Sequence, residues 1–306
     1  MSVIKEHLIS LTAIEAAFAK NGYVTDSSTA TALKLMSSLK KPLLIEGPAG
    51  VGKTEIAKAL ALVLQTRLIR LQCYEGLDVH SALYEWNYQK QLLHLKLSEN
   101  DGRSLRQKEA DLFDQTYLLR RPLLEALTDQ VSSPVLLIDE IDRTDEAFEA
   151  YLLETLAEFQ VTIPELGTIV AQHRPYIVLT SNRTRELSDA LRRRCLYQWI
   201  SYPDIEKEMQ ILQARIPDMN AALAEQISVM MEQIRRLPLV KTPGIAESLD
   251  WAIALMTVHQ GVLDTETMRE TLGCILKDRD DWELVLHEMK HGELLKNILS
   301  AGNVER

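Results

Sequence analysis

The sequence predicts an α/β fold in which a parallel five-stranded β-sheet is flanked by helices and followed by an all-helical domain. Two continuous apolar runs, at 43–45 and 134–138, are typical of strands buried on both faces of a parallel sheet. Strand and helix patterns alternate through roughly the first two thirds of the chain, which is the arrangement that builds such a sheet. Beyond Tyr202 we find only helical periodicity, so we expect domains at 1–203 and 204–306.

The composition limits the classes of protein that the chain can represent. At 306 residues it is long enough for roughly two domains. The net charge of −10 argues against a main role in non-specific nucleic-acid binding, which requires a basic face. No apolar run approaches the ~18 residues of a membrane span, and the N-terminus lacks the apolar core of a signal peptide. We therefore expect a cytoplasmic protein, in which the scattered Cys73, Cys195 and Cys274 are reduced thiols.

The first elements are expected to surround the strand at 43–45. The segments 3–20 and 29–39 have the apolar spacing of helices. The strand leads through a glycine-rich turn into a helix that ends near Leu64, and 67–71 alternates like a second strand. We therefore expect two helices ahead of a strand–loop–helix unit.

The least regular part of the sequence is an insertion at about 72–117. Within it we expect a short strand at 92–97 and an exposed helix or flexible segment at 98–114, where both charges are mixed. A helix is expected at 123–128, because Pro122 suits the first turn of a helix.

The later elements follow from the same patterns. After the strand at 134–138, a helix carries a stripe formed by Phe148, Leu152, Leu156 and Phe159. A Pro-Glu-Leu-Gly turn predicts a hairpin. We expect its strands at 161–163 and 168–170, further strands at 176–180 and 195–200, and helices at 205–214, 221–237, 245–258, 265–276 and 282–299.

The turn after the first strand matches the phosphate-loop pattern G-x-x-x-x-G-K-[ST] in the strand–loop–helix context that this pattern requires. Glycines let successive backbone N–H groups converge on an anion, and the N-terminus of the next helix adds its positive dipole end. Lys53 then reaches the β- and γ-phosphates, and the Thr54 hydroxyl suits Mg²⁺. We therefore predict a nucleoside triphosphate site at Gly47, Pro48, Ala49, Gly50, Val51, Gly52, Lys53, Thr54 and Glu55.

Polar side chains follow two other predicted strands. Asp139 and Glu140 directly follow the apolar run at 134–138, and Asn182 follows the strand at 176–180. Ligands of parallel α/β sheets lie at the carboxyl ends of the strands, so we expect Asp139 to hold Mg²⁺ and Glu140 to activate a water as general base. Asn182 has a donor and an acceptor with which to orient that water, although a strand-terminal Asn is more often a turn former. The paired acids favour hydrolysis over transfer by a kinase.

Three consecutive arginines, Arg192, Arg193 and Arg194, precede the last predicted strand. On a helix they point about 100° apart, so no more than two of them share one target. Two interpretations stay open. They form a solvated basic helix end, which the helix dipole favours, or one of them reaches the γ-phosphate bound by a neighbouring subunit.

These elements, in this order and ahead of a helical domain, resemble a P-loop AAA+ core with its helical lid domain, and more closely the MoxR family of AAA+ ATPases. The resemblance covers nearly the whole chain. It is carried by 45–54, 71–73, 139–143, and 153–154 leading to 160–163. Within that family, 84–88 and 118–124 are similar to the CoxD-like branch of carbon monoxide dehydrogenase accessory ATPases.

The resemblance implies a homo-hexameric ring with ATP bound between subunits. It also implies the roles given above to Asp139, Glu140 and Asn182, with Asn182 as sensor 1. Arg194, with Arg193 as the alternative, matches the arginine that acts on the neighbouring subunit's nucleotide. Arg143 matches the family's arginine after the acidic pair and would face the same interface. Tyr23 and Val24 fall where such proteins hold adenine.

The resemblance also implies a biological role: ATP-driven remodelling or maturation of a protein, usually with a von Willebrand factor A-domain partner. The CoxD-like branch implies a client metalloenzyme of the molybdenum hydroxylase class, such as carbon monoxide dehydrogenase. Two alternatives stay open, a small-molecule P-loop kinase and an AAA+ motor acting on nucleic acid. The basic tracts available to such a motor, at 120–121 and 192–194, are short.

One position departs from the family pattern. The sensor-2 arginine of the family follows a Ser-Pro or Thr-Pro at the start of a lid helix, whereas Thr242 and Pro243 are followed by Gly244. Either Lys241 substitutes for it, or the lid responds to nucleotide by another route.

The segment from His287 to His291 spells the zinc-protease pattern H-E-x-x-H. We expect a coincidence, because both histidines fall opposite the apolar stripe of their helix and no suitable third ligand follows. That stripe is predicted at Trp282, Val285, Leu286 and Met289.

Overall fold

The computed structural model describes residues 10–97, 112–258 and 264–291, which form two compact units. The first unit contains Ser28–Glu46 and Leu60–Gln198. The second contains Thr12–Ser27, Gly47–Ala59 and the chain from Trp199 onward. Each unit encloses its own cluster of buried apolar side chains.

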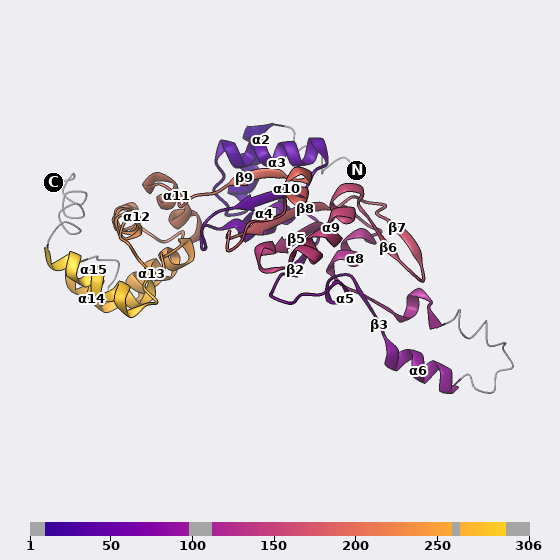
Figure 1. Ribbon diagram of the computed structural model, residues 1–306. Helices are drawn as coiled ribbons and strands as arrows, with labels where there is room; N and C mark the ends of the chain where they lie inside the picture. Colours follow the sequence, from indigo (N-terminus) through magenta and orange to yellow (C-terminus); the bar gives the residue numbers. More distant parts are fainter. Residues whose placement is uncertain (1–9, 98–111, 259–263, 292–306) are drawn as a thin grey trace. The chain divides into compact units, whose positions relative to one another are not determined.

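A five-stranded sheet is the centre of the first unit (Figure 1). The spatial order is β2-β5-β8-β1-β9, and β2 pairs with β5, β5 with β8, and β8 with β1 in parallel. The predicted α/β fold with a parallel five-stranded sheet and C-terminal helices is confirmed. The strands are β1 (Leu43–Glu46), β2 (Leu68–Gln72), β5 (Val135–Asp139), β8 (Tyr176–Ser181) and β9 (Leu196–Trp199).

The apolar runs of the sequence form the interior strands. Every residue of β1 and of β5 is buried, including the acids Glu46 and Asp139 at their carboxyl ends. Strand β2 instead alternates, with Leu71 buried and Arg70 and Gln72 exposed. Its parallel register with β5 places Gln72 opposite Asp139, so the polar positions of β2 lie beside the acidic end of β5.

The helices around the sheet begin where the sequence supplies capping groups. Pro122 is at the start of its helix, and the carboxylate of Asp145 accepts the Phe148 N–H at 2.8 Å. Phe159 ends the next helix in the left-handed conformation, at φ 54°. These helices are α3 (Ser27–Leu39), α8 (Pro122–Leu127), α9 (Glu146–Glu158) and α10 (Asp189–Arg194).

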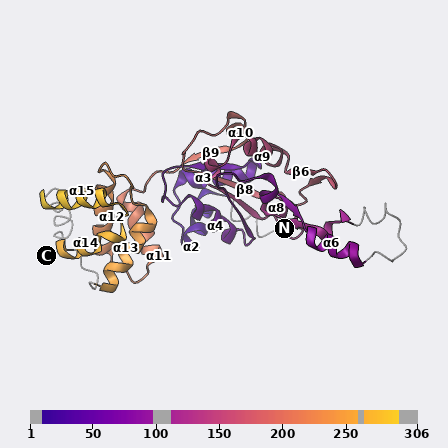
Figure 2. The same cartoon turned by 60° about the horizontal axis from the view of Figure 1, so that its bottom comes forward.

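The predicted strand at 92–97 is wrong, because α6 (Tyr88–Leu97) is helical there. The Asn87 side chain accepts the Lys90 N–H at 3.0 Å and so caps the helix, and the buried Gln91 amide donates to the Leu112 carbonyl. Leu92, Leu93 and Leu97 are all exposed, so their run is not the buried strand that its composition suggested. In both views α6 lies away from the sheet (Figure 1, Figure 2).

The region of the insertion also contains an unpredicted two-stranded sheet. Strand β3 (Tyr84–Trp86) pairs antiparallel with β4 (Leu118–Arg120), and α5 (Val79–Ala82) precedes it. Most of the segment expected at 98–114 lies outside the described residues. The predicted hairpin around the Pro-Glu-Leu-Gly turn is confirmed as β6 (Gln160–Ile163) and β7 (Gly167–Val170).

From Ile205 onward the described part of the chain is helical, as expected. Asp204, Asn220 and Asp264 cap three of its helices through their side chains. The helices pack around the fully buried Trp251. They are α11 (Ile205–Arg215), α12 (Ala221–Arg235), α13 (Ile245–Val258), α14 (Thr265–Thr271), a short 3-10 turn (Leu272–Cys274) and α15 (Arg279–His291).

Two predicted helices extend beyond the described residues. The one expected at 3–20 is seen as α2 (Leu11–Lys20), and the one expected at 282–299 is seen as far as His291. Among the described helices, none combines the length and the apolar character needed to span a membrane.

Candidate functional site

The phosphate loop lies in the second unit and depends on its glycines. Gly50 and Gly52 have φ of 78° and 86°, in the left-handed region that side chains disfavour. A Cβ on Gly47 would lie 2.1 Å from the Ile200 carbonyl oxygen, so this position also requires glycine. Helix α4 (Lys53–Val63) begins directly after the loop. The backbone therefore has the turn and the helix N-terminus on which an anion site is built.

Lys53 lies over this loop. Its ammonium group donates to the carbonyl oxygens of Gly47 at 2.8 Å and of Pro48 at 2.6 Å. The side chain is therefore held where it neutralises an anion bound by the loop. Thr54, the next residue of α4, supplies a hydroxyl suited to Mg²⁺. The predicted loop residues thus fit the triphosphate and its metal ion.

Asp139 ends β5 with both carboxylate oxygens engaged. Oδ1 accepts a hydrogen bond from the Thr180 hydroxyl at 2.6 Å, and Oδ2 accepts from Arg70 Nε at 3.0 Å and Nη2 at 2.5 Å. Thr180 lies on β8 and Arg70 on β2, so the two neighbouring strands orient this carboxylate. Neither partner was predicted, since only the strand order brings them to Asp139.

Glu140 follows in a left-handed backbone conformation, at φ 58° and ψ 49°. Its N–H donates to the Thr180 hydroxyl at 2.9 Å, so one hydroxyl joins both acids. Its carboxylate accepts from Gln72 at 3.1 Å and pairs with Arg143 Nε at 3.0 Å, both at Oε2. The other oxygen, Oε1, lies 3.5 Å from the Asn182 amide nitrogen. The structure therefore brings together Glu140, Asn182 and Arg143.

Asp142 fixes the backbone that carries Asn182. Its buried carboxylate accepts the Asn182 N–H at 3.2 Å, the Thr184 N–H at 2.9 Å and the Thr184 hydroxyl at 2.7 Å. The acid was part of the resemblance, but this role was not predicted. A second acid two residues after Glu140 was the available signal for it.

The arginines of α10 diverge, as helical geometry requires. Arg192 lies 3.5 Å from the buried carboxylate of Glu46, and Arg194 donates to the Ala190 carbonyl at 3.0 Å. Arg193 is exposed. Arg192 thus contacts an acid of its own chain, whereas Arg193 and Arg194 take no part in that ion pair.

The residues expected around adenine lie in the second unit. The Tyr23 ring packs edge-on against Phe18 at 5.8 Å, and burial, then the charges of Asp26 and Glu55, raises the pKa of Tyr23. Burial alone would raise the pKa of Glu55, but hydrogen bonds and charges from Lys58 and Arg215 lower it. Val24, the other residue expected there, is half-buried.

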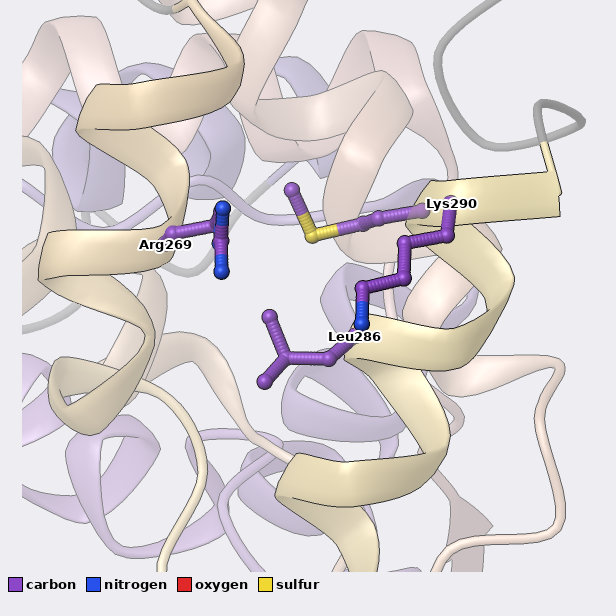
Figure 3. Close-up of a pocket in the computed structure, with 4 residues that line it drawn as sticks. Arg269, Leu286 and Lys290 are labelled. Carbon is purple, nitrogen blue, oxygen red and sulfur yellow. The ribbon is translucent and has the colours of Figure 1, made fainter.

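Helix α15 differs in part from the predicted stripe. Val285 and Met289 are buried and Leu286 is partly buried, but Trp282 is 39% exposed and so does not belong to the stripe. His287 is exposed, on the side away from those buried residues. Figure 3 shows a small pocket between α14 and α15, lined by Arg269, Leu286, Met289 and Lys290. Two of its four residues are basic and none is acidic or catalytic in type.

Half of the chain matches a known protein family. Residues 42–195, about half of the chain, match the model of the AAA domain, dynein-related subfamily. The chain is 25% identical over 228 residues to the uncharacterized protein SH1500 of Staphylococcus haemolyticus, covering 71% of this chain and 78% of that protein. It is 24% identical over 201 residues to the uncharacterized protein SAB1265c of Staphylococcus aureus, covering 62% of this chain and 68% of that protein.

Solved structures of Thermotoga maritima RuvB are also similar. The structure described as a Holliday junction branch migration motor has a TM-score of 0.45 at 20% identity, over 89% of this chain and 73% of that chain. A point mutant of RuvB has a TM-score of 0.47 at the same identity and coverage.

Proposed function

This chain belongs to the AAA domain family, dynein-related subfamily, and is therefore an AAA+ ATPase by family. From that premise we propose that it binds Mg²⁺·ATP at 47–54 and hydrolyses ATP with Glu140 as general base. The observation that carries the proposal is the convergence of Glu140 and Asn182 beside the buried Asp139. A kinase has no use for a second acid and an amide placed to position a water.

Each residue has a task in this reaction. Lys53 and the loop N–H groups hold the phosphates, and Thr54 and Asp139 would hold Mg²⁺, which neutralises charge on the β- and γ-phosphates when bound. Glu140 accepts a proton from the attacking water, and the Asn182 amide orients that water. Tyr23 and Val24 are proposed to contact the adenine.

We further propose a homo-hexamer in which Arg194, or else Arg193, acts on the nucleotide of the neighbouring subunit. The contact between Arg192 and Glu46 supports this choice, because it engages Arg192 within its own subunit and leaves Arg193 and Arg194 as the candidates. Arg143 pairs with Glu140 in the single chain, and we propose that it turns toward the interface when the ring forms.

The sequence resemblance supports a finer proposal of MoxR-type remodelling with a von Willebrand factor A-domain partner. The proposed client is a metalloenzyme of the molybdenum hydroxylase class. The net charge of −10 argues against the alternative of a nucleic-acid motor.

The test is Glu140→Gln, measured by phosphate release, ATP binding and light scattering after size exclusion. We expect hydrolysis to fall at least a hundredfold, in the range typical of a lost general base, with ATP binding retained and a mass near six subunits in Mg²⁺·ATP. Glu158→Gln, the same change at an exposed position of α9, is the control and should hydrolyse normally. Normal hydrolysis by Glu140→Gln would remove Glu140 from the mechanism, and ATP binding by Lys53→Ala at wild-type affinity would remove the phosphate site.

A further inference from the structure

The chain after β9 contacts the phosphate loop directly, within the second unit. The Ile245 N–H donates to the Gly50 carbonyl oxygen at 2.8 Å, and the Tyr202 hydroxyl donates to the Ala49 carbonyl oxygen at 3.2 Å. Both contacts use carbonyl oxygens of the loop. Phosphate binding uses its N–H groups, so the two sets of contacts are compatible.

The turn that supplies Ile245 approaches the loop backbone to backbone. A Cβ on Gly244 would lie 2.5 Å from the Gly50 Cα and 2.7 Å from its carbonyl oxygen. No side chain fits in that space. The absence of a sensor-2 arginine after Pro243 thus coincides with a close contact that any side chain at 244 would break.

Arg235 holds both contacting elements in place. Its side chain, 6% exposed, pairs with the buried Glu208 at 2.6 Å and 2.8 Å, donates from Nε to the Pro243 carbonyl at 2.9 Å, and stacks 5.0 Å from the Tyr202 ring centroid. It also donates to the Ser248 hydroxyl at 3.0 Å. One guanidinium therefore joins α11, α13, the turn and Tyr202. A planar group with five donors is suited to this task, and lysine is not.

We propose that Arg235 is a positioning residue for nucleotide binding: it sets Tyr202 and the Pro243–Gly244 turn against the carbonyl side of the phosphate loop, in place of an arginine that touches the phosphates. The inference rests on the proposed ATP site. Because the loop is ordered before ATP arrives, less conformational freedom is lost on binding. Loss of these contacts weakens ATP binding and leaves the hydrolytic residues intact.

The test uses the full chain and compares Gly244→Ala with Gly273→Ala. Both add one methyl group to the helical domain, but nothing lies within 4 Å of a Cβ at Gly273. We expect Gly244→Ala to raise the KM and the Kd for ATP about fivefold or more, the effect of roughly one lost hydrogen bond, with kcat within twofold of wild type. Amide exchange at 50–52 and at Ile245 should be faster. A partly unfolded protein would instead lower kcat at constant KM.

A second, milder variant keeps the inference testable should Gly244→Ala not fold. Tyr202→Phe removes the hydroxyl that donates to Ala49 and keeps the ring under Arg235, so we expect about a two- to fivefold rise in Kd. Wild-type Kd in Tyr202→Phe and in a folded Gly244→Ala would overturn the inference while leaving the ATP site standing. Absence of ATP binding by the wild-type chain, equal to that of Lys53→Ala, would refute the proposed function itself.

Discussion

Thr180→Val tests whether one hydroxyl organises Asp139 and Glu140, the two acids proposed to act in hydrolysis. The hydroxyl donates to Asp139 Oδ1 at 2.6 Å and accepts the Glu140 N–H at 2.9 Å, in a side chain that is 1% exposed. Valine keeps the shape and suits a strand, so β8 itself should be unaffected. The loss combines a hydrogen bond to a charged group, worth about 1.5–3 kcal/mol, with a backbone N–H left without its acceptor, about 1–3 kcal/mol.

We therefore expect the free energy of unfolding to fall by about 2.5–6 kcal/mol. The hydroxyl also secures Glu140 in a left-handed conformation that costs about 1–2 kcal/mol, so we expect kcat to fall at least tenfold as the carboxylate loses its position. Urea denaturation and phosphate release measure the two effects. Thr168→Val, at an exposed position of β7, is the matched control and should change neither. Wild-type stability and kcat in Thr180→Val would refute the role given to this hydroxyl.

Three further outcomes follow from the contacts of other side chains. Arg70→Met frees Oδ2 of Asp139, so the Mg²⁺ concentration for half-maximal ATPase activity should fall; a rise would show that Arg70 supports metal binding. Arg235→Met leaves the buried Glu208 charge unpaired, so the free energy of unfolding measured in urea should fall by about 3–5 kcal/mol. Adding Glu208→Gln should restore most of that stability, and equal stability of the single and double variants would contradict this reasoning. Burial, then the charges of nearby acids, raises the pKa of the Cys73 thiol to about 12, whereas the pKa of a cysteine thiol in the unfolded chain is about 8.5. As the pH rises, the unfolded chain therefore releases this proton first, so the free energy of unfolding should fall between about pH 8.5 and 12, and should fall less in Cys73→Ala. The same dependence of stability on pH in wild type and Cys73→Ala would show that the thiol is not the cause.

The sequence predicted best those parts of the fold and of the candidate site that are formed by consecutive residues. The phosphate loop is a continuous segment whose glycines, lysine and threonine each have a local physical reason, and β1 and β5 appeared as unbroken apolar runs. The acids at the end of β5 were predicted to matter because parallel strands deliver their carboxyl ends to one edge.

Partners contributed by other strands could not be predicted in the same way. Arg70 and Thr180 meet Asp139 only because β2 and β8 flank β5 in this register, which no local pattern specifies. Arg235 belongs to no motif in the sequence, yet its side chain is almost fully buried and contacts residues distant in the chain, Glu208 and Tyr202. The segment 92–97 was predicted as a strand because its leucines form an apolar run, but in α6 Leu92, Leu93 and Leu97 are exposed.

The backbone of Glu140 has a consequence for how this protein balances folding against activity. At φ 58° the position would suit asparagine or glycine better than glutamate, so the fold gives up stability to keep a carboxylate there. Substitutions such as Glu140→Asn should therefore abolish turnover and, at the same time, raise the melting temperature. Stability and the proposed hydrolysis thus make opposite demands on the residue at this position.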